Sequence, residues 1–516
     1  MNDPMLPPPG TTAAPMAAGL KRNFMKFAIF FSVNHGCVTS VLGISLAILG
    51  DEGSYMSGAL YLTYAATALV ASGAIIAALG TRGALICGTA VYCVYIVSLP
   101  LALLAKTATT QTLVAISGGA IGGVAAGFLW AAQGAYFAAS AKLYADAGGG
   151  DGSLTPEQAS ASFAASFGVI FLGLELLLKV LPLGLKAIEL AAESGDQPIA
   201  PGPNQPLSPP PPSLPPSLPE AAPASLKTSQ LIVAVTYSIL AIGSAIAMVS
   251  IWDLDKLKRE RIPQSSSTEC APTATPTEES SSAPPQVILN TPPPSAAPAA
   301  VREACDKGLK KAASAVILWR KKPTVVLLAP VQITFGLCVA LLGYEMTGIV
   351  APLAFPDNTV VAVGLLTALV SLTSALLQVP FLYISKSSFG KAPVMIIGLL
   401  AFAALATLIL RLSKEELTHY FPLILSYVLQ GVGRACYEGT NKALYADFFP
   451  QDSEAAFANI VLAGGTASAV AFFVFPIPEL TRMWRASAAL VSALIALGAY
   501  VGAEAMHRAE KRRMIQ

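Results

Sequence analysis

Two pairs of oppositely charged residues interrupt long apolar stretches of the sequence. Arg434 and Glu438 are four residues apart, and Glu175 and Lys179 repeat this spacing. Residues four apart share one face of a helix, and an ionisable side chain at the bilayer centre costs at least about 2.5–3.5 kcal/mol. We expect Arg434 and Glu438 either to form a structural ion pair between helices or to line a central cavity, where Glu438 could exchange a proton or meet a cation. For Glu175 and Lys179 we favour the structural ion pair.

Uncharged polar residues occur in the same kind of apolar segment. Asn34 and His35 are neighbours, and the imidazole can serve either as a helix-packing donor or as a proton relay, because its ordinary pKa is near 6.5. Gln133, Tyr136 and Gln332 carry groups that join transmembrane helices by hydrogen bonds or contact a substrate. All five are candidates for binding or coupling a solute or ion.

The composition indicates a membrane protein. Of 516 residues, 54% are hydrophobic and 12% are charged, whereas soluble domains carry about 25% charged residues. This argues against a soluble enzyme and excludes a wholly disordered chain. The net charge of +2 indicates no nucleic-acid partner.

Motifs for energy-coupled or hydrolytic chemistry are missing from the sequence. It contains no Walker A, HExxH or GxSxG motif and no Cys or His spacing typical of a metal site. We therefore expect neither an enzyme nor an ATP-driven pump, and no cofactor or metal.

Apolar segments long enough to cross a bilayer occur in two groups of six, because a spanning helix needs about 20 residues. They lie at 24–49, 55–79, 83–105, 111–138, 161–187 and 229–252, and then at 324–345, 359–384, 391–411, 421–446, 455–477 and 484–505. This arrangement predicts an all-α polytopic membrane protein with 12 transmembrane helices in two pseudo-symmetric six-helix bundles.

The remaining segments separate the two bundles and flank them. We expect a disordered cytosolic N-terminus, a Pro-rich outer loop in the first bundle, a disordered and basic cytosolic central loop, and a basic cytosolic tail. The N-terminus is 1–23, and the first bundle is 24–252 with the Pro-rich loop at 198–223. The central loop is 253–323, the second bundle is 324–505, and the tail is 506–516.

The distribution of basic residues predicts the orientation. With the N-terminus in the cytosol, 23 Lys and Arg fall on the cytosolic side and 6 on the other. Cytosolic loops carry an excess of Lys and Arg, so both termini are expected in the cytosol. The resident membrane stays open between plasma membrane and endomembrane.

Three sequence motifs resemble the Unc-93-like branch of the major facilitator superfamily. Residues 119–136 read GAIGGVAAGFLWAAQGAY, in which Leu129, Trp130, Gln133 and Gly134 are similar to the Leu-Trp-x-x-Gln-Gly that ends the family's fourth span. Residues 431–450 and 456–473 resemble its tenth and eleventh spans. The chain departs from the family at Tyr437, where Tyr-Glu-Gly-Thr replaces the Trp-Asn-Thr-Gln of relatives.

The resemblance implies a fold and two kinds of function. Two six-helix bundles would place the first, fourth, seventh and tenth spans around a central cavity, so that His35, Gln133, Gln332, Arg434 and Glu438 converge near mid-membrane. The leading hypothesis is a transporter or transporter-like protein that moves a small solute or ion by alternating access. The alternative is a non-transporting regulatory or trafficking partner of an ion channel or other membrane protein, because the family includes such members.

Overall fold

The computed structural model describes residues 13–149, 155–195, 224–258, 306, 310 and 313–515, and their regular structure is helical throughout. The Pro-rich segment 198–223, most of the central loop and the first 12 residues lie outside the described residues. The prediction of an all-α protein is confirmed for the described part of the chain.

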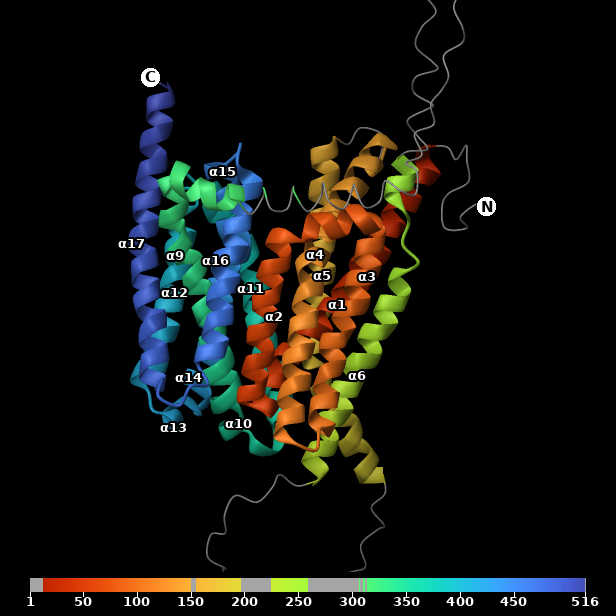
Figure 1. Ribbon diagram of the computed structural model, residues 1–516, viewed down its shortest axis with the longest axis vertical. Helices are drawn as coiled ribbons and strands as arrows, with labels where there is room; N and C mark the ends of the chain where they lie inside the picture. Colours follow the sequence, from red (N-terminus) through yellow and green to blue (C-terminus); the bar gives the residue numbers. More distant parts are fainter. Residues whose placement is uncertain are drawn as a thin grey trace, which may run out of the picture.

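The first half contains six helices that run up and down the bundle (Figure 1). They are α1 (Ala13–Leu49), α2 (Asp51–Val70), α3 (Ser72–Leu104), α4 (Ala108–Asp146), α5 (Pro156–Gly195) and α6 (Ala224–Met248).

The second half repeats this arrangement with two interruptions by π-helix. It comprises α9 (Pro323–Leu341) continued by the π-helix η2 (Leu342–Val350) and α10 (Ala351–Ala354), the short η3 (Pro356–Asn358), α11 (Thr359–Lys386), α12 (Ala392–Arg411), α13 (Lys414–Leu417), α14 (Tyr420–Ala435) continued by the π-helix η4 (Cys436–Asn441) and α15 (Lys442–Phe448), α16 (Ser453–Val474) and α17 (Arg482–Ile515).

The turn between the second and third predicted spans lies within α3. Gly80 has a φ of 71°, a left-handed conformation that glycine adopts without steric cost. The break at Ala71 between α2 and α3 keeps right-handed helical dihedrals. The predicted span 55–79 therefore corresponds to α2 together with the first turns of α3.

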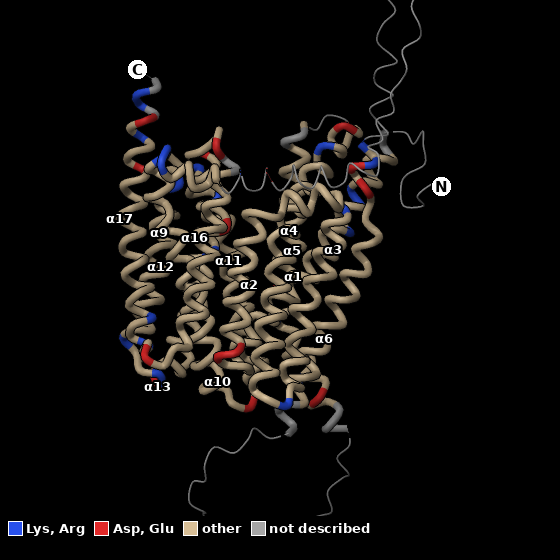
Figure 2. The backbone as a smooth tube through the Cα atoms, in the orientation of Figure 1, with Lys and Arg blue, Asp and Glu red and all other residues tan. Residues whose placement is uncertain are grey.

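Ten helices in the described part of the chain are long and apolar enough to cross a membrane. The two predicted spans missing from this set are α2, and α14 with its continuations η4 and α15. Figure 2 shows acidic and basic residues gathered at the two ends of the bundle and few between them. An apolar middle band of this kind fits the hydrocarbon core of a bilayer.

The two halves are in contact along α2 with α16 and along α5 with α11. At Gly364 a Cβ atom would lie 2.4 Å from the carbonyl oxygen of Lys179. Only a residue without a side chain allows α11 to approach the backbone of α5 this closely. Small residues at helix interfaces permit such packing in membrane proteins.

The contacts between the halves differ at the two ends of the bundle. We name the end at which α1 begins and α17 ends the terminal end, and the other the opposite end (Figure 1). At the opposite end, the Ser54 hydroxyl donates to the Phe472 carbonyl at 2.7 Å. Toward the terminal end, a cavity of about 360 Å³ separates α2 and α4 from α16. The halves are therefore joined at the opposite end and separated by a cavity near the terminal end.

Candidate functional site

Four side chains from three helices form a hydrogen-bonded cluster between the two halves. Glu175 on α5 accepts from Lys179 Nζ at 2.7 Å, from Ser371 Oγ on α11 at 2.9 Å, and from two nitrogens of Arg434 on α14 at 3.0 and 3.2 Å. The Ser371 hydroxyl also lies 2.8 Å from Lys179 Nζ and 3.2 Å from Arg434. We call these four residues the central cluster.

The central cluster contains two cations and one carboxylate. Two parallel bonds from one guanidinium to one carboxylate are a strong form of ion pair. The Glu175 side chain is 1% exposed, whereas that of Arg434 is 20% exposed. The cluster therefore carries one excess positive charge, and Arg434 is the member that presents it to the surroundings.

Glu438 does not pair with Arg434 in the described structure. It lies 2.6 Å from Lys442, and both of these side chains are exposed. A glutamate that precedes a lysine by four residues is the favoured order on a helix, and the Arg434–Glu438 order is the reverse. Arg434 instead uses a carboxylate on a facing helix, a choice that spacing within one segment cannot reveal.

Glu175 and Lys179 form the ion pair expected from their spacing, with an Nζ–Oε1 distance of 2.7 Å. The pair is part of a larger assembly, because the same carboxylate also binds Arg434. It therefore takes part in joining the halves as well as in stabilising α5.

His35 lies among aromatic rings from three helices. Its ring centroid is 4.9 Å from that of Trp130, edge-on, and 5.3 Å from that of Phe171, stacked. Its Nδ1 is buried and has no hydrogen-bond partner in the described part of the chain. Phe31 contacts both Trp130 and Phe171, so the histidine is held in an aromatic environment, and Phe171 lies one turn before Glu175 on α5.

Asn34 forms its hydrogen bonds with α3 and α6. Its amide nitrogen lies 3.3 Å from the Ala241 carbonyl on α6 and 3.4 Å from the Thr89 carbonyl on α3. The side chain is buried. Asn34 therefore joins α1 to α3 and α6 and does not contact the cavity.

Tyr136 also joins helices. Its fully buried hydroxyl accepts from the Asn23 amide at 2.8 Å and donates to the Trp252 carbonyl at 3.0 Å. The Trp252 backbone N–H donates in turn to Asn23 Oδ1. These bonds connect α1, α4 and the segment after α6 at the terminal end.

Gln332 makes a reciprocal amide pair with Asn441. The two side chains exchange hydrogen bonds of 3.1 Å, and Gln332 also donates to the Tyr445 hydroxyl at 3.3 Å. Gln332 and Asn441 are fully buried. This pair joins α9 to η4 and α15.

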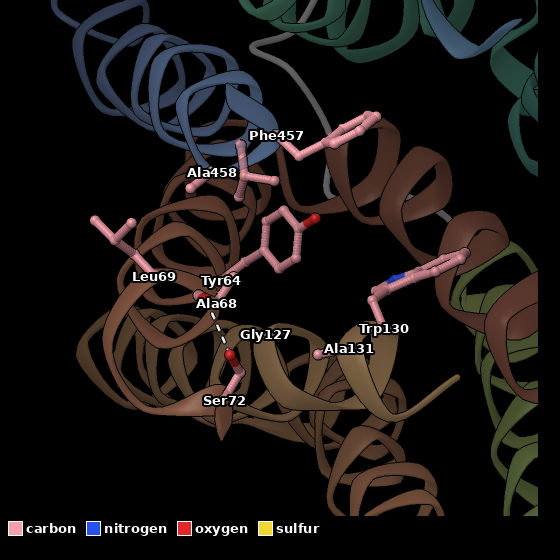
Figure 3. Close-up of a pocket in the computed structure, with 10 residues that line it drawn as sticks. Tyr64, Ala68, Leu69, Ser72, Gly127, Trp130, Ala131, Phe457 and Ala458 are labelled. Atoms are coloured by element: carbon pink, nitrogen blue, oxygen red, sulfur yellow. Dashed lines mark hydrogen bonds between the residues drawn. The ribbon is translucent and has the colours of Figure 1, made fainter. Parts of the chain in front are cut away.

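Trp130 lines the cavity between α2, α4 and α16. Figure 3 shows its indole facing the same space as Tyr64 and Phe457. Gln133 lies half-buried one turn further along α4, and a Cβ at Gly134 would meet no atom within 4 Å. Of Leu129, Trp130, Gln133 and Gly134, Trp130 is the one that lines this cavity, and the other motif residues in its lining are Gly127, Ala131, Phe457, Ala458 and Val461.

Tyr437 lies outside the lining of this cavity. Its ring stacks on that of Phe335, with centroids 3.6 Å apart and an interplanar angle of 4°. It therefore packs η4 against α9.

A second cluster of charged residues lies at the opposite end, and the sequence did not predict it. Glu345 on η2 is buried and pairs with Arg485 on α17 at 2.7 Å. The Arg485 guanidinium lies 4.9 Å from the centroid of the Tyr344 ring, whose hydroxyl donates to Asp51 on α2 at 2.9 Å. We call these four residues the opposite-end cluster. The missed signal was Glu345, which fell at the predicted end of an apolar segment.

The described residues contain no group of three His, Cys, Asp or Glu side chains that could hold a metal ion. The five cysteines in this part of the chain are free thiols.

Comparison with known proteins identifies the fold. The family model of the Major Facilitator Superfamily matches residues 333–513, and no curated protein matches the sequence. The chain is similar to solved structures of the nucleoside transporter NupG (TM-score 0.55, 11% identity, 94% of this chain and 99% of that one) and of the xylose transporter XylE from E. coli (0.51, 13%, 95% and 96%). It is also similar to the peptide transporter POT (0.52, 13%, 96% and 99%). This chain therefore has the fold of the major facilitator superfamily.

Proposed function

We propose that this protein is a secondary membrane transporter that moves a small solute or ion by alternating access between its two halves. The observation that carries the proposal is the central cluster, in which Arg434 of the second half binds Glu175 of the first half while its own side chain stays partly exposed. A charge at this depth needs a functional or structural reason. The branch assigned by the motifs, Unc-93-like, is part of the same proposal.

The arrangement of the halves supports one state of a transport cycle. Alternating access requires the halves to rock about a fixed central site. Contacts at the opposite end and the cavity near the terminal end correspond to a state that is open toward the termini. With both termini in the cytosol, as the excess of basic residues favours, this state faces inward.

Transport by the purified protein in liposomes tests the proposal. The first solutes to test are a nucleoside, xylose and a dipeptide, because structures of nucleoside, xylose and peptide transporters share the fold. We expect the double variant Arg434→Ala and Glu438→Gln to lose most of the uptake seen with the native chain. The control is Arg508→Ala, which removes an exposed arginine paired with Glu504. Uptake by the double variant at the native rate would contradict the assigned centre.

The alternative is a partner protein that regulates or escorts another membrane protein without transport. It is favoured by the turn after Gly80, where Arg82 donates to the Val249 and Ile251 carbonyls at 2.6 and 2.8 Å. These bonds hold the turn to the first half and leave Arg82 without a contact to the second half in the described structure. Copurification of a second membrane protein in a fixed ratio would support this alternative, if the purified protein alone transports no solute in liposomes.

A further inference from the structure

The charge balance around the cavity favours one sign of ligand. The central cluster holds Lys179 and Arg434 against Glu175 alone. The nearby carboxylate of Glu438 is paired with Lys442 at 2.6 Å. The neighbourhood therefore keeps one positive charge without a countercharge, and an anion would supply it.

Arg434 has donors left for such an anion. A guanidinium carries five N–H groups, and three hydrogen bonds from Arg434 are present in the described structure, two to Glu175 and one to Ser371. Its side chain remains 20% exposed, whereas those of Glu175 and Lys179 are buried. Arg434 is thus the member of the cluster that a ligand can reach.

The walls of the cavity favour a flat apolar group. Tyr64, Trp130 and Phe457 border one space of about 360 Å³ (Figure 3). Aromatic rings gain energy from stacked or edge-on contact with another ring, beyond the area that they bury. A benzene or indole ring fits this lining better than a sugar, because most of the lining is apolar and few polar groups (Tyr64, Ser72 and the Trp130 indole N–H) are present to pair with several hydroxyl groups.

The aromatic walls and the charged cluster are adjacent. Trp130 contacts the ring of His35 at 4.9 Å, His35 stacks on the ring of Phe171 at 5.3 Å, and Phe171 precedes Glu175 of the central cluster by one turn of α5. On the facing helix α2, Tyr61 lies one turn before Tyr64, and its ring stacks on that of Phe472 with centroids 5.8 Å apart. One layer of side chains therefore separates the cavity from the excess positive charge.

We propose that this site selects solutes in which an aromatic ring carries a single anionic group. The ring packs between Trp130, Tyr64 and Phe457, and the anionic group is directed toward Arg434, whose excess positive charge and N–H groups left unused by Glu175 and Ser371 attract it across one layer of side chains. A cationic analogue is rejected because it adds to the excess positive charge. This inference rests on the proposed function for the site that it describes, and it adds the chemical class of the solute.

Calorimetric binding to the full chain in nanodiscs tests the inference with four probes. Indole-3-acetate is anionic and aromatic, indole-3-acetamide is its neutral analogue, tryptamine is a cationic one, and cyclohexylacetate is an anion without an aromatic ring. We expect indole-3-acetate to bind at least about tenfold more tightly than each of the others. Equal or tighter binding of the amide or of tryptamine, or no binding of indole-3-acetate, would overturn the inference.

Variants separate the two parts of the recognition. Arg434→Gln should bring the acetate and the amide to within about threefold of each other, while Arg508→Gln, at an exposed arginine of the C-terminal helix, leaves the preference intact. If Arg434→Gln does not fold, the double variant Glu175→Gln with Arg434→Gln removes the same donors without stranding a carboxylate. Trp130→Leu should reduce the preference for indole-3-acetate over cyclohexylacetate. A preference for the anion that persists in both Arg434 variants would also overturn the inference.

Uptake by liposomes distinguishes this inference from the transporter proposal. Selective binding of indole-3-acetate without uptake of any solute would contradict transport and leave the anionic aromatic site in place. Uptake of neutral or cationic solutes, without selective binding of the anion, would do the reverse.

Discussion

The central and opposite-end clusters both join the two halves, yet they expose different charges. In the central cluster the side chain of Glu175 is buried, whereas that of Arg434 is partly exposed. In the opposite-end cluster Glu345 is sealed by Arg485, whose side chain is more deeply buried than that of Arg434. The first has one excess positive charge, and the second, with Asp51 included, has one excess negative charge.

This difference indicates different tasks. An ion pair whose side chains are both buried is not accessible to a ligand, and it stabilises the contact between the two surfaces that it joins. A pair with an exposed cation can accept a second anion while it keeps the first. We therefore assign ligand contact to the central cluster and closure of the opposite end to the second cluster, since rocking bundles must break contacts at one end to open it.

The largest effect is expected from Glu175→Ala. This change leaves Lys179 and Arg434 without their carboxylate, and removing one partner of a buried pair costs about 3–5 kcal/mol in free energy of unfolding. Thermal unfolding of the purified protein in detergent measures the loss.

The matched control for this variant is Glu189→Ala on the same helix. Glu189 pairs with Lys186 at 3.0 Å, and both side chains are about 40% exposed, so we expect a loss of about 1 kcal/mol or less. Similar losses in the two variants would mean that the central cluster does not join the halves as described.

A somewhat smaller effect is expected from Arg485→Ala. It leaves the buried Glu345 without its ion pair, at a cost of about 3 kcal/mol, but strands one charge where Glu175→Ala strands two. Adding Glu345→Gln to Arg485→Ala should restore part of the stability, because an amide is neutral. If the double variant unfolds no later than the single one, the pair does not stabilise the opposite end.

The architecture could be predicted from the sequence because apolar runs determine where helices cross a bilayer. Six runs, a long polar interruption and six more runs are enough to indicate two bundles. The same reasoning located Arg434, Glu438 and Glu175, because a charge in an apolar run stands out by its cost.

The choice of partners could not be predicted in the same way. Spacing within one segment finds neighbours on one helix, such as Glu175 and Lys179, whereas Arg434 binds a residue 259 positions away. Ser371 carries no charge and gives no signal in an apolar span. The amide pair of Gln332 with Asn441 depends on the packing of α9 against the π-helix η4, and neither sequence segment contains a marker for that packing.

The smallest effect on stability is expected from Glu438→Gln. Glu438 lies on the same transmembrane segment as Arg434. Its ion pair with Lys442 has side chains that are 39% and 46% exposed, and such pairs contribute about 0–1 kcal/mol. The free energy of unfolding should therefore stay within about 1 kcal/mol of the native value. If Glu438 couples transport to protons, uptake driven by a pH gradient should fall at least about tenfold, while exchange of solute across liposomes without a gradient continues. Parallel loss of both activities would assign Glu438 to solute binding, and a stability loss as large as that of Glu175→Ala would contradict the contrast between an exposed pair and a sealed one.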